Sequence, residues 1–202
     1  MTPTQSNKLF LLLIVFLMTL TSCAQNESKT PSAAQSNAPR NTSVSTTDRE
    51  TYKNGVTALY KNNLSQAQRI FNEFIRSQPN LAGGYSNLAL IHFKKKEFDK
   101  SLKQVNKALS LNPKQAQALN LRAQIYVING EIHKAKDDYL LAVKYKPNYI
   151  NAQYNLALLY DIYLQEIKLA IKHYQIYMTL LKKPDEATKE WISHLEGTLK
   201  DA

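Results

Sequence analysis

Few side chains in this sequence have the types and spacing that catalysis or metal binding requires. The four histidines are far apart in the chain, and no two have the spacing of a helical metal site: His92, His133, His173 and His194. Serine and aspartate are plentiful, but neither a glycine-rich phosphate loop nor a nucleophile elbow accompanies them. We therefore expect no enzymatic activity, no metal site and no cofactor.

The single cysteine, Cys23, excludes an intramolecular disulfide and a cysteine-based zinc site, since both need at least two thiols. It follows a positive residue, Lys8, and an apolar run from Leu9 to Leu20. Such a run is too short to span a bilayer core, which needs about 20 apolar residues. A positive start, an apolar centre and small residues at the end are typical of an export signal.

The ending Leu20-Thr21-Ser22-Cys23 resembles the lipobox of bacterial lipoproteins. In that family the cysteine is acylated through its sulfur and becomes the first residue of the mature chain, and a thiolate is the nucleophile suited to this thioether. The resemblance implies a signal peptide over 1–22 and a lipid on Cys23. An ordinary secretory signal or an uncleaved anchor are the alternatives.

Ala24 follows the cysteine where an Asp would be the retention signal of Gram-negative lipoproteins. The resemblance therefore implies a lipid-anchored protein of the bacterial cell envelope, at the periplasmic face of the outer membrane.

Residues 24–47 predict a tether. Of these 24 residues, 20 are Ser, Thr, Asn, Gln, Pro or Ala, so the stretch cannot bury a core. As a flexible coil it would span roughly 25–30 Å. We expect 23–47 to be a disordered segment that holds a folded body away from the membrane.

The folded body is repetitive. Pro79, Pro113 and Pro147 are spaced 34 residues apart, and Pro184 follows 37 residues later. Ahead of each proline an apolar residue precedes a small one by three positions. The four pairs are Leu64 and Ala67, Phe98 and Ser101, Ile132 and Ala135, and Ile167 and Ala170.

A further small residue occurs upstream in each unit, at Gly55, Ala89, Ala123 and Ala157. Small side chains at helical spacing allow two helices to approach closely. Turn-forming residues separate the two halves of a unit, and a proline follows the second half. Each unit is thus predicted to be an antiparallel helix pair.

This pattern resembles the tetratricopeptide repeat family across about 48–184. The resemblance implies an all-α fold, a right-handed α-solenoid of about four helix pairs over 48–81, 82–115, 116–149 and 150–184. The first unit has Ala58 in place of the usual aromatic residue, and the fourth has extra residues around 161–165. Phe74 and Tyr177 are bulky where a small residue is usual.

The last segment, 185–202, is predicted to be a C-terminal capping helix. Its apolar residues Trp191, Ile192, Leu195 and Leu199 form one stripe at helical spacing. Covering the terminal repeat is the interpretation that we favour, since an uncovered apolar face would reduce solubility. The alternative is that the stripe binds a partner.

In this family, the first helices of successive pairs line a concave groove that binds an extended peptide or a helix. The resemblance implies groove positions at Tyr52, Lys53, Asn87, Leu90, Asn120, Gln124, Tyr154, Asn155 and Asp161. Amide side chains there could hydrogen-bond a peptide backbone, or they could merely stabilise the stack. A clamp for the acidic tails of chaperones is disfavoured, because only Asn87 and Asn155 match its pattern.

The net charge of +10 and the pI of 9.5 favour an acidic partner or surface, but export argues against nucleic acid. We expect a non-catalytic, lipid-anchored adaptor that binds an envelope protein through the concave surface and supports assembly of a cell-envelope complex. The alternatives are a pilotin-like factor of type IV pilus biogenesis and a binder of an anionic envelope polymer.

Overall fold

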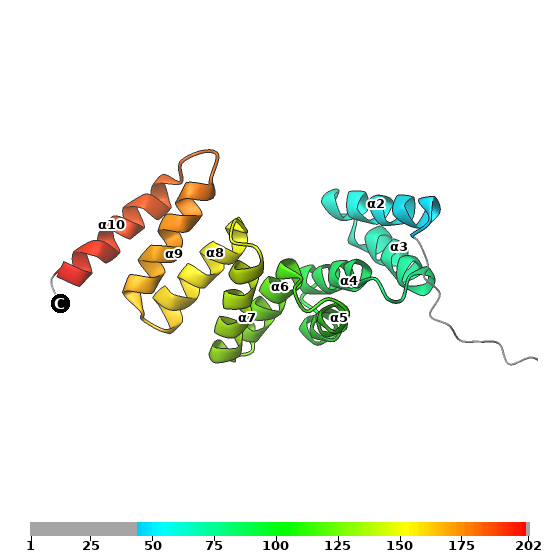
Figure 1. Ribbon diagram of the computed structural model, residues 1–202, viewed down its shortest axis with the longest axis horizontal. Coiled ribbons are helices and arrows are strands. Elements are labelled where there is room, and N and C mark those ends of the chain that lie inside the picture. The colour runs from blue at the N-terminus through cyan, green and yellow to red at the C-terminus, as the bar shows by residue number, and fades with distance from the viewer. Residues whose placement is uncertain (1–43, 201–202) are drawn as a thin grey trace, which may run out of the picture. The chain divides into compact units, whose positions relative to one another are not determined.

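The computed structural model describes residues 44–200, so the predicted signal peptide, the predicted lipidation site Cys23 and most of the predicted tether lie outside the described residues. Within 44–200 the chain forms nine α-helices and one π-helix, with no strand (Figure 1). The helices are α2 (Thr46–Tyr60), α3 (Leu64–Ser77), α4 (Ala82–Lys94), α5 (Phe98–Leu111), α6 (Ala116–Ile128), α7 (Ile132–Tyr145), α8 (Ile150–Leu158), η1 (Leu159–Tyr163), α9 (Ile167–Leu180) and α10 (Glu186–Lys200). The predicted all-α class is confirmed.

Helix α2 starts earlier than the sequence pattern indicated. Ser45 caps it, and Ser45 and Asp48 form a capping box in which each side chain bonds the other residue's backbone N–H. Thr46 and Thr47, which we had assigned to the tether, therefore belong to the first helix.

A similar turn connects the two helices of each pair. Asn62, Lys96, Gly130 and Gln165 all have a positive φ, between 53° and 77°. In the first three pairs the next backbone N–H bonds a carbonyl five residues back, as in Glu97 to His92 at 2.9 Å and Glu131 to Tyr126 at 2.8 Å. In the fourth pair Glu166 bonds Tyr160, six residues back, at 2.9 Å. This left-handed ending satisfies free carbonyl groups of the first helix and reverses the chain.

The pairs α2–α3, α4–α5, α6–α7 and α8–α9 pack in chain order, each against the next (Figure 1). Small residues make the contact within a pair close. A Cβ added to Gly55 would lie 2.8 Å from Cζ of Phe71, and Ala89, Ala123 and Ala157 have no exposed surface. The spacing of small residues therefore sets the distance between paired helices.

Phe74, which is bulky where the repeat usually has a small residue, is accommodated by a glycine on the next pair. A Cβ on Gly84 would lie 2.8 Å from Cδ1 of Phe74 and 2.6 Å from Cγ2 of Ile75. The following pairs have Ala118 and Ala152 at the positions equivalent to Gly84. At the first interface between pairs, a larger residue on α3 (Phe74) is therefore matched by a smaller residue on α4 (Gly84).

The extra residues of the fourth unit form the π-helix η1 (Leu159–Tyr163). From the start of α7 at Ile132 to the start of α9 at Ile167 the spacing is 35 residues, one more than the repeat period. A π-helical turn accommodates one additional residue without breaking the helix. The insertion therefore leaves the register of the pair intact.

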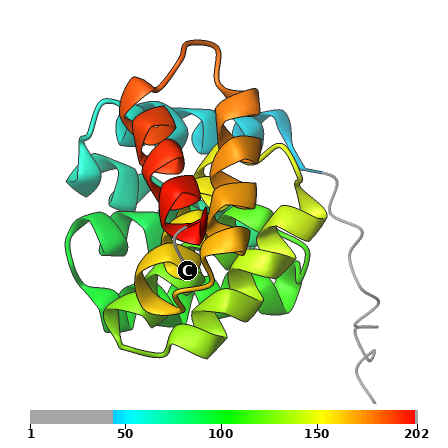
Figure 2. The same cartoon turned by 90° about the vertical axis from the view of Figure 1, so that its left-hand side faces the viewer.

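Helix α10 packs against α9 (Figure 2). Ile192 and Leu195 are buried in the same cluster as Tyr174. Trp191 and Leu199 are 44% and 37% exposed, so only half of the predicted apolar stripe is covered. The reason is that α10 packs mainly against α9, and no further repeat follows among the described residues to cover its other side.

Candidate partner-binding groove

The first helices carry most of the groove residues that the resemblance implied, and hydrogen bonds link two pairs of them. The Asn87 amide donates to the Tyr52 hydroxyl, and the Asn155 amide donates to Oδ1 of Asn120, each at 3.0 Å. Both bonds join residues 35 apart in the chain, in the same repeat register. These amides join neighbouring helix pairs, and they also border pockets where a peptide could bind. Stabilising the stack and facing the groove are therefore compatible roles for them.

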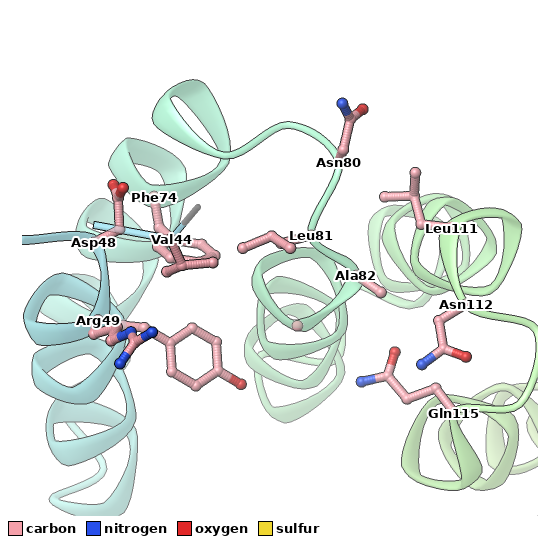
Figure 3. A pocket seen from close by; sticks show the side chains of 12 residues that line it. Val44, Asp48, Arg49, Phe74, Asn80, Leu81, Ala82, Leu111, Asn112 and Gln115 are labelled. Carbon is pink, nitrogen blue, oxygen red and sulfur yellow. The ribbon is translucent and has the colours of Figure 1, made fainter. Parts of the chain in front are cut away.

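A pocket of about 590 Å³ lies at the N-terminal end of the described residues (Figure 3). It joins three helix pairs, because its lining includes Tyr52 of α2, Ala82 of α4 and Gln115, which precedes α6. Its other lining residues are Val44, Asp48, Arg49, Phe74, Asn80, Leu81, Gly83, Leu111 and Asn112. Of the predicted groove residues, this pocket contains Tyr52 alone.

Asp48 borders this pocket as a firmly held carboxylate. The hydroxyls of Ser45 and Ser77 and the amide of Gln78 donate to it at 2.7–2.9 Å and lower its pKa from the ordinary value. Asp48 therefore stays ionised near neutral pH, and its hydrogen bonds tie the start of α2 to the end of α3.

Gln115, on the opposite wall, is only half satisfied. Its amide nitrogen donates to the Ser86 hydroxyl at 2.9 Å, but its buried Oε1 has no hydrogen-bond partner. The amides of Asn112 and Gln115 lie together on that wall (Figure 3). The exposed amide of Asn112 is the group on this wall that can hydrogen-bond a peptide backbone.

Two further pockets involve predicted groove residues. Asn87 and Leu90 line one of about 380 Å³ between α2 and α4, beside the 89%-exposed Tyr60. Asn120, Gln124, Tyr154 and Asn155 line another of about 420 Å³ between α6 and α8. Lys53 is exposed and lines none of these pockets.

A pocket of about 270 Å³ lies between η1 and α10 at the C-terminal end of the described residues, and Tyr154 and Asp161 border it. Oδ2 of Asp161 accepts from the Tyr174 hydroxyl at 3.1 Å and from the Trp191 indole N–H at 2.7 Å. Burial, followed by the Asp161 carboxylate, raises the pKa of Tyr174. Asp161 thus attaches the capping helix to the fourth pair besides bordering a pocket.

The repeat pattern did not predict the pocket residues in and beside the loops between pairs, above all Leu81, Leu111, Asn112 and Gln115. The sequence feature that could have indicated them is their position beside the prolines, because the loops between pairs recur with the same 34-residue period. Their approach to α2 depends on stacking and has no local sequence signature.

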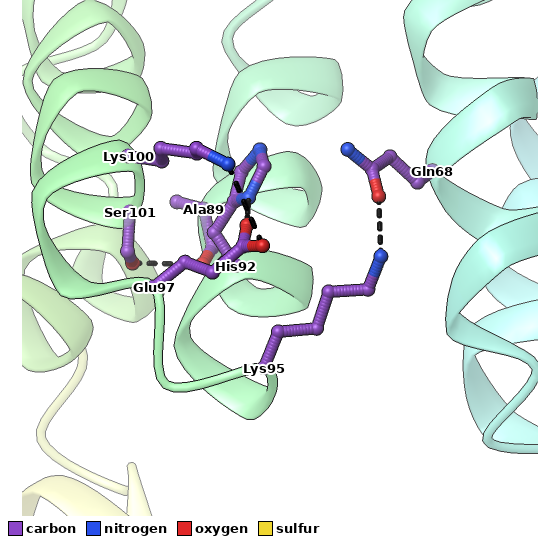
Figure 4. A network of polar contacts seen from close by, with 7 residues as sticks. All are labelled: Gln68, Ala89, His92, Lys95, Glu97, Lys100 and Ser101. Carbon is purple, nitrogen blue, oxygen red and sulfur yellow. Dashed lines mark hydrogen bonds and ion pairs between the residues drawn. The ribbon is translucent and has the colours of Figure 1, made fainter.

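The histidines have structural partners or are exposed. Nδ1 of His92 lies 2.6 Å from a carboxylate oxygen of Glu97, and this contact lowers the pKa of Glu97 (Figure 4). Nδ1 of the buried His173 lies 2.8 Å from Oε1 of Gln153. Burial lowers the pKa of His173 to about 4. His133 and His194 are exposed. Among residues 44–200, no group of three or more His, Cys, Asp or Glu could hold a metal ion.

Arg122 of α6 and Asp138 of α7 form a two-pronged ion pair, with N–O distances of 2.6 and 2.8 Å. Hydrogen bonding to Asp138 raises the pKa of Arg122. This pair holds the third helix pair together. None of the helices between residues 44 and 200 is both long and apolar enough to cross a membrane.

Comparison with known proteins supports the repeat assignment. Two tetratricopeptide-repeat family models match, one over 82–115 and one over 105–137, and neither indicates a catalytic family. No curated protein matches the sequence.

Solved structures share the fold at low identity. PilF of Pseudomonas aeruginosa is 17% identical with a TM-score of 0.67, covering 76% of this chain and 69% of PilF. MamA of Desulfovibrio magneticus RS-1 is 15% identical with a TM-score of 0.63, covering 79% and 89%. The first repeat domain of Spaghetti (RPAP3), solved with an HSP90 peptide, is 19% identical with a TM-score of 0.53, covering 56% and 90%.

Identities this low establish the fold alone. Together with the matching repeat models and the helix pairs described above, they show that the described chain is a solenoid of tetratricopeptide repeats, a fold that serves protein–protein interaction.

Proposed function

We propose that this chain is a lipid-anchored, non-catalytic adaptor at the periplasmic face of the outer membrane, where it binds a protein of the cell envelope and supports assembly of an envelope complex. The observation that carries the binding role is the series of pockets along the first helices, bordered by Tyr52, Asn87, Asn120 and Tyr154. The anchor and the location rest on the lipobox-like ending at Cys23.

The chemistry of these pockets suits an extended peptide. Apolar side chains such as Leu81, Leu90 and Leu111 can receive alternate side chains of a partner. The amides of the exposed Asn112 and the half-buried Gln124 can hydrogen-bond its backbone. Recognition of this kind depends on shape and backbone groups rather than on one charged residue.

Crosslinking in living cells, followed by mass spectrometry of what is captured, tests the adaptor role. A groove variant, Gln124→Arg with Asn151→Arg, places bulk and charge in the pocket between α6 and α8. The matched control, Ser65→Arg with Thr179→Arg, adds the same charge to exposed positions of α3 and α9. We expect the groove variant to lose the partner and the control to keep it. Equal capture by both variants would contradict binding in this pocket.

Cys23→Ala tests the anchor separately. Loss of membrane association with an unchanged solenoid is the expected result. If the variant fractionates with membranes as the natural chain does, lipidation of Cys23 is wrong, while the groove test above still stands.

A narrower candidate is a pilotin-like role in type IV pilus biogenesis, motivated by the combination of a predicted lipid anchor with a four-pair solenoid. Deletion should then lower the amount of assembled outer-membrane secretin. Normal multimer levels in the deletion strain would exclude this role and leave the general adaptor function open.

A further inference from the structure

Helix α5 carries a row of exposed lysines on one of its sides. Lys100, Lys103 and Lys107 are exposed, and Lys96 and Lys114, also exposed, lie just before and just after the helix. Because an α-helix turns about 100° per residue, the three helical lysines fall within about 60° of one another. We call these five residues the α5 lysine row.

The row lies on the side of α5 that faces away from the core. Ser101, Val105 and Ala108 are buried on the opposite side. Lys100 lies 3.5 Å from a carboxylate oxygen of Glu97 (Figure 4), and Lys107 lies 5.8 Å from the ring centre of Tyr85. The acidic residues nearest in sequence are Glu97 and Asp99, so the row keeps a net positive charge.

The repeat itself does not require this charge. At the positions of Lys96, Lys100, Lys103, Lys107 and Lys114, the first unit has Asn62, Gln66, Arg69, Glu73 and Asn80, and the third unit has Gly130, Lys134, Asp137, Leu141 and Asn148. Both of those sets are neutral overall. The fourth unit, aligned on the start of α9, has Gln165, Leu169, Lys172, Ile176 and Lys183, so it has two lysines at these positions. Packing of the helix pairs therefore does not require all five lysines, which only the second unit has.

We propose that the α5 lysine row docks the solenoid onto an anionic phospholipid surface, so that the predicted tether limits the distance of the folded body from the membrane and does not keep the two apart. The three helical lysines form a rigid line about 10 Å long, which a flat layer of mobile headgroups can match with several phosphates at once. A row of this kind on a helix is the sequence feature associated with anionic lipid. Lys100, Lys103 and Lys107 line none of the pockets described above, so protein binding in those pockets does not require this contact.

The test measures which lysines a membrane shields. The full chain, with its N-terminal region, is reconstituted with vesicles of phosphatidylglycerol and phosphatidylethanolamine, or with neutral phosphatidylcholine vesicles. A water-soluble amine reagent then labels exposed lysines, and mass spectrometry reports each site. Lys168, Lys182 and Lys183, exposed at the C-terminal end, are the internal controls.

We expect several-fold lower labelling of Lys103 and Lys107 on anionic vesicles only, with the controls unchanged and with protection lost at high salt. Equal labelling of both sets on both vesicles would overturn the proposal. Protection by a soluble polyphosphate chain but not by anionic vesicles would also overturn it, and would favour an anionic polymer as the ligand.

Matched variants separate position from net charge. Lys100→Gln, Lys103→Gln and Lys107→Gln together remove three charges from the row, and Lys168→Gln, Lys182→Gln and Lys183→Gln remove three elsewhere. Protection of Lys96 and Lys114 on anionic vesicles should disappear in the first variant and persist in the second. The same loss in both variants would show that net charge, and not the row, drives binding.

Discussion

The indole N–H of Trp191 donates to the carboxylate of Asp161 at 2.7 Å, joining the capping helix α10 to the π-helix η1 across 30 residues of sequence. Asp161 also accepts from Tyr174 of α9. One carboxylate therefore connects three elements at the C-terminal end of the described chain.

Trp191→Phe should loosen this connection. The variant keeps an aromatic ring but removes the donor, and we expect a loss of about 0.5–1.5 kcal/mol in the free energy of unfolding. Urea denaturation measures the loss, and hydrogen exchange should show faster exchange confined to α10. Tyr163→Phe, an exposed position in the same π-helix, is the control and should have no effect. Unchanged exchange in α10 would mean that the bond contributes nothing to the cap.

Gly84→Ala should destabilise the interface between the first two helix pairs. The new Cβ would lie 2.6 Å from Ile75 and 2.8 Å from Phe74, so we expect a cost of about 1–3 kcal/mol in chemical denaturation. Gly197→Ala is the matched control: nothing lies within 4 Å of its Cβ, and alanine favours helix, so that variant should be neutral or stabilising.

The double variant Gly84→Ala with Phe74→Leu should recover part of the loss of Gly84→Ala, because the smaller side chain makes room for the new methyl group. Strictly additive effects of the two changes would contradict direct packing between these positions.

Arg122→Met should be costly because it leaves the carboxylate of Asp138 buried without its cation. The Asp138 side chain is only 6% exposed, and removing one partner of a buried pair costs about 3–5 kcal/mol. Lys136→Met, on the neighbouring α7, removes the same charge without a buried partner. If the two variants unfold at the same urea concentration, the ion pair does not support the third helix pair.

Stability should fall in mild acid because of His173. Burial, followed by the charge of Lys172, lowers the pKa of His173 from 6.5 to about 4, so the unfolded chain binds a proton more readily than the folded one. The stability that comes from keeping His173 neutral is fully present above pH 6.5, the pKa in the unfolded chain, and is lost as the pH falls toward about 4. The full loss is about 3 kcal/mol.

His173→Gln should flatten the dependence of unfolding free energy on pH over that interval, whatever its effect on absolute stability. His194→Gln, at an exposed position, should leave the dependence as it is. An unaltered slope in His173→Gln would assign the acid sensitivity to other groups.

Local spacing was sufficient to predict the helix pairs. The prolines at 79, 113 and 147, the small residues such as Ala89 and the turn residues at 62, 96 and 130 each act within one pair. Helix periodicity, a left-handed turn and a proline stop are properties of short segments, so a sequence alone reveals them. The start of α2 was misjudged because the capping box of Ser45 lies in a stretch whose composition is that of a linker.

The pockets required the tertiary structure. Tyr52, Leu111 and Gln115 are up to 63 residues apart in the chain and meet only because three pairs stack. The same holds for Asp161, which the repeat pattern predicted as a groove residue but which also bonds Trp191. Sequence determined which residues form helices and turns, since those depend on near neighbours. Which side chains share a pocket was decided by the distance and angle between stacked pairs, which depend on the volumes of residues packed across each interface.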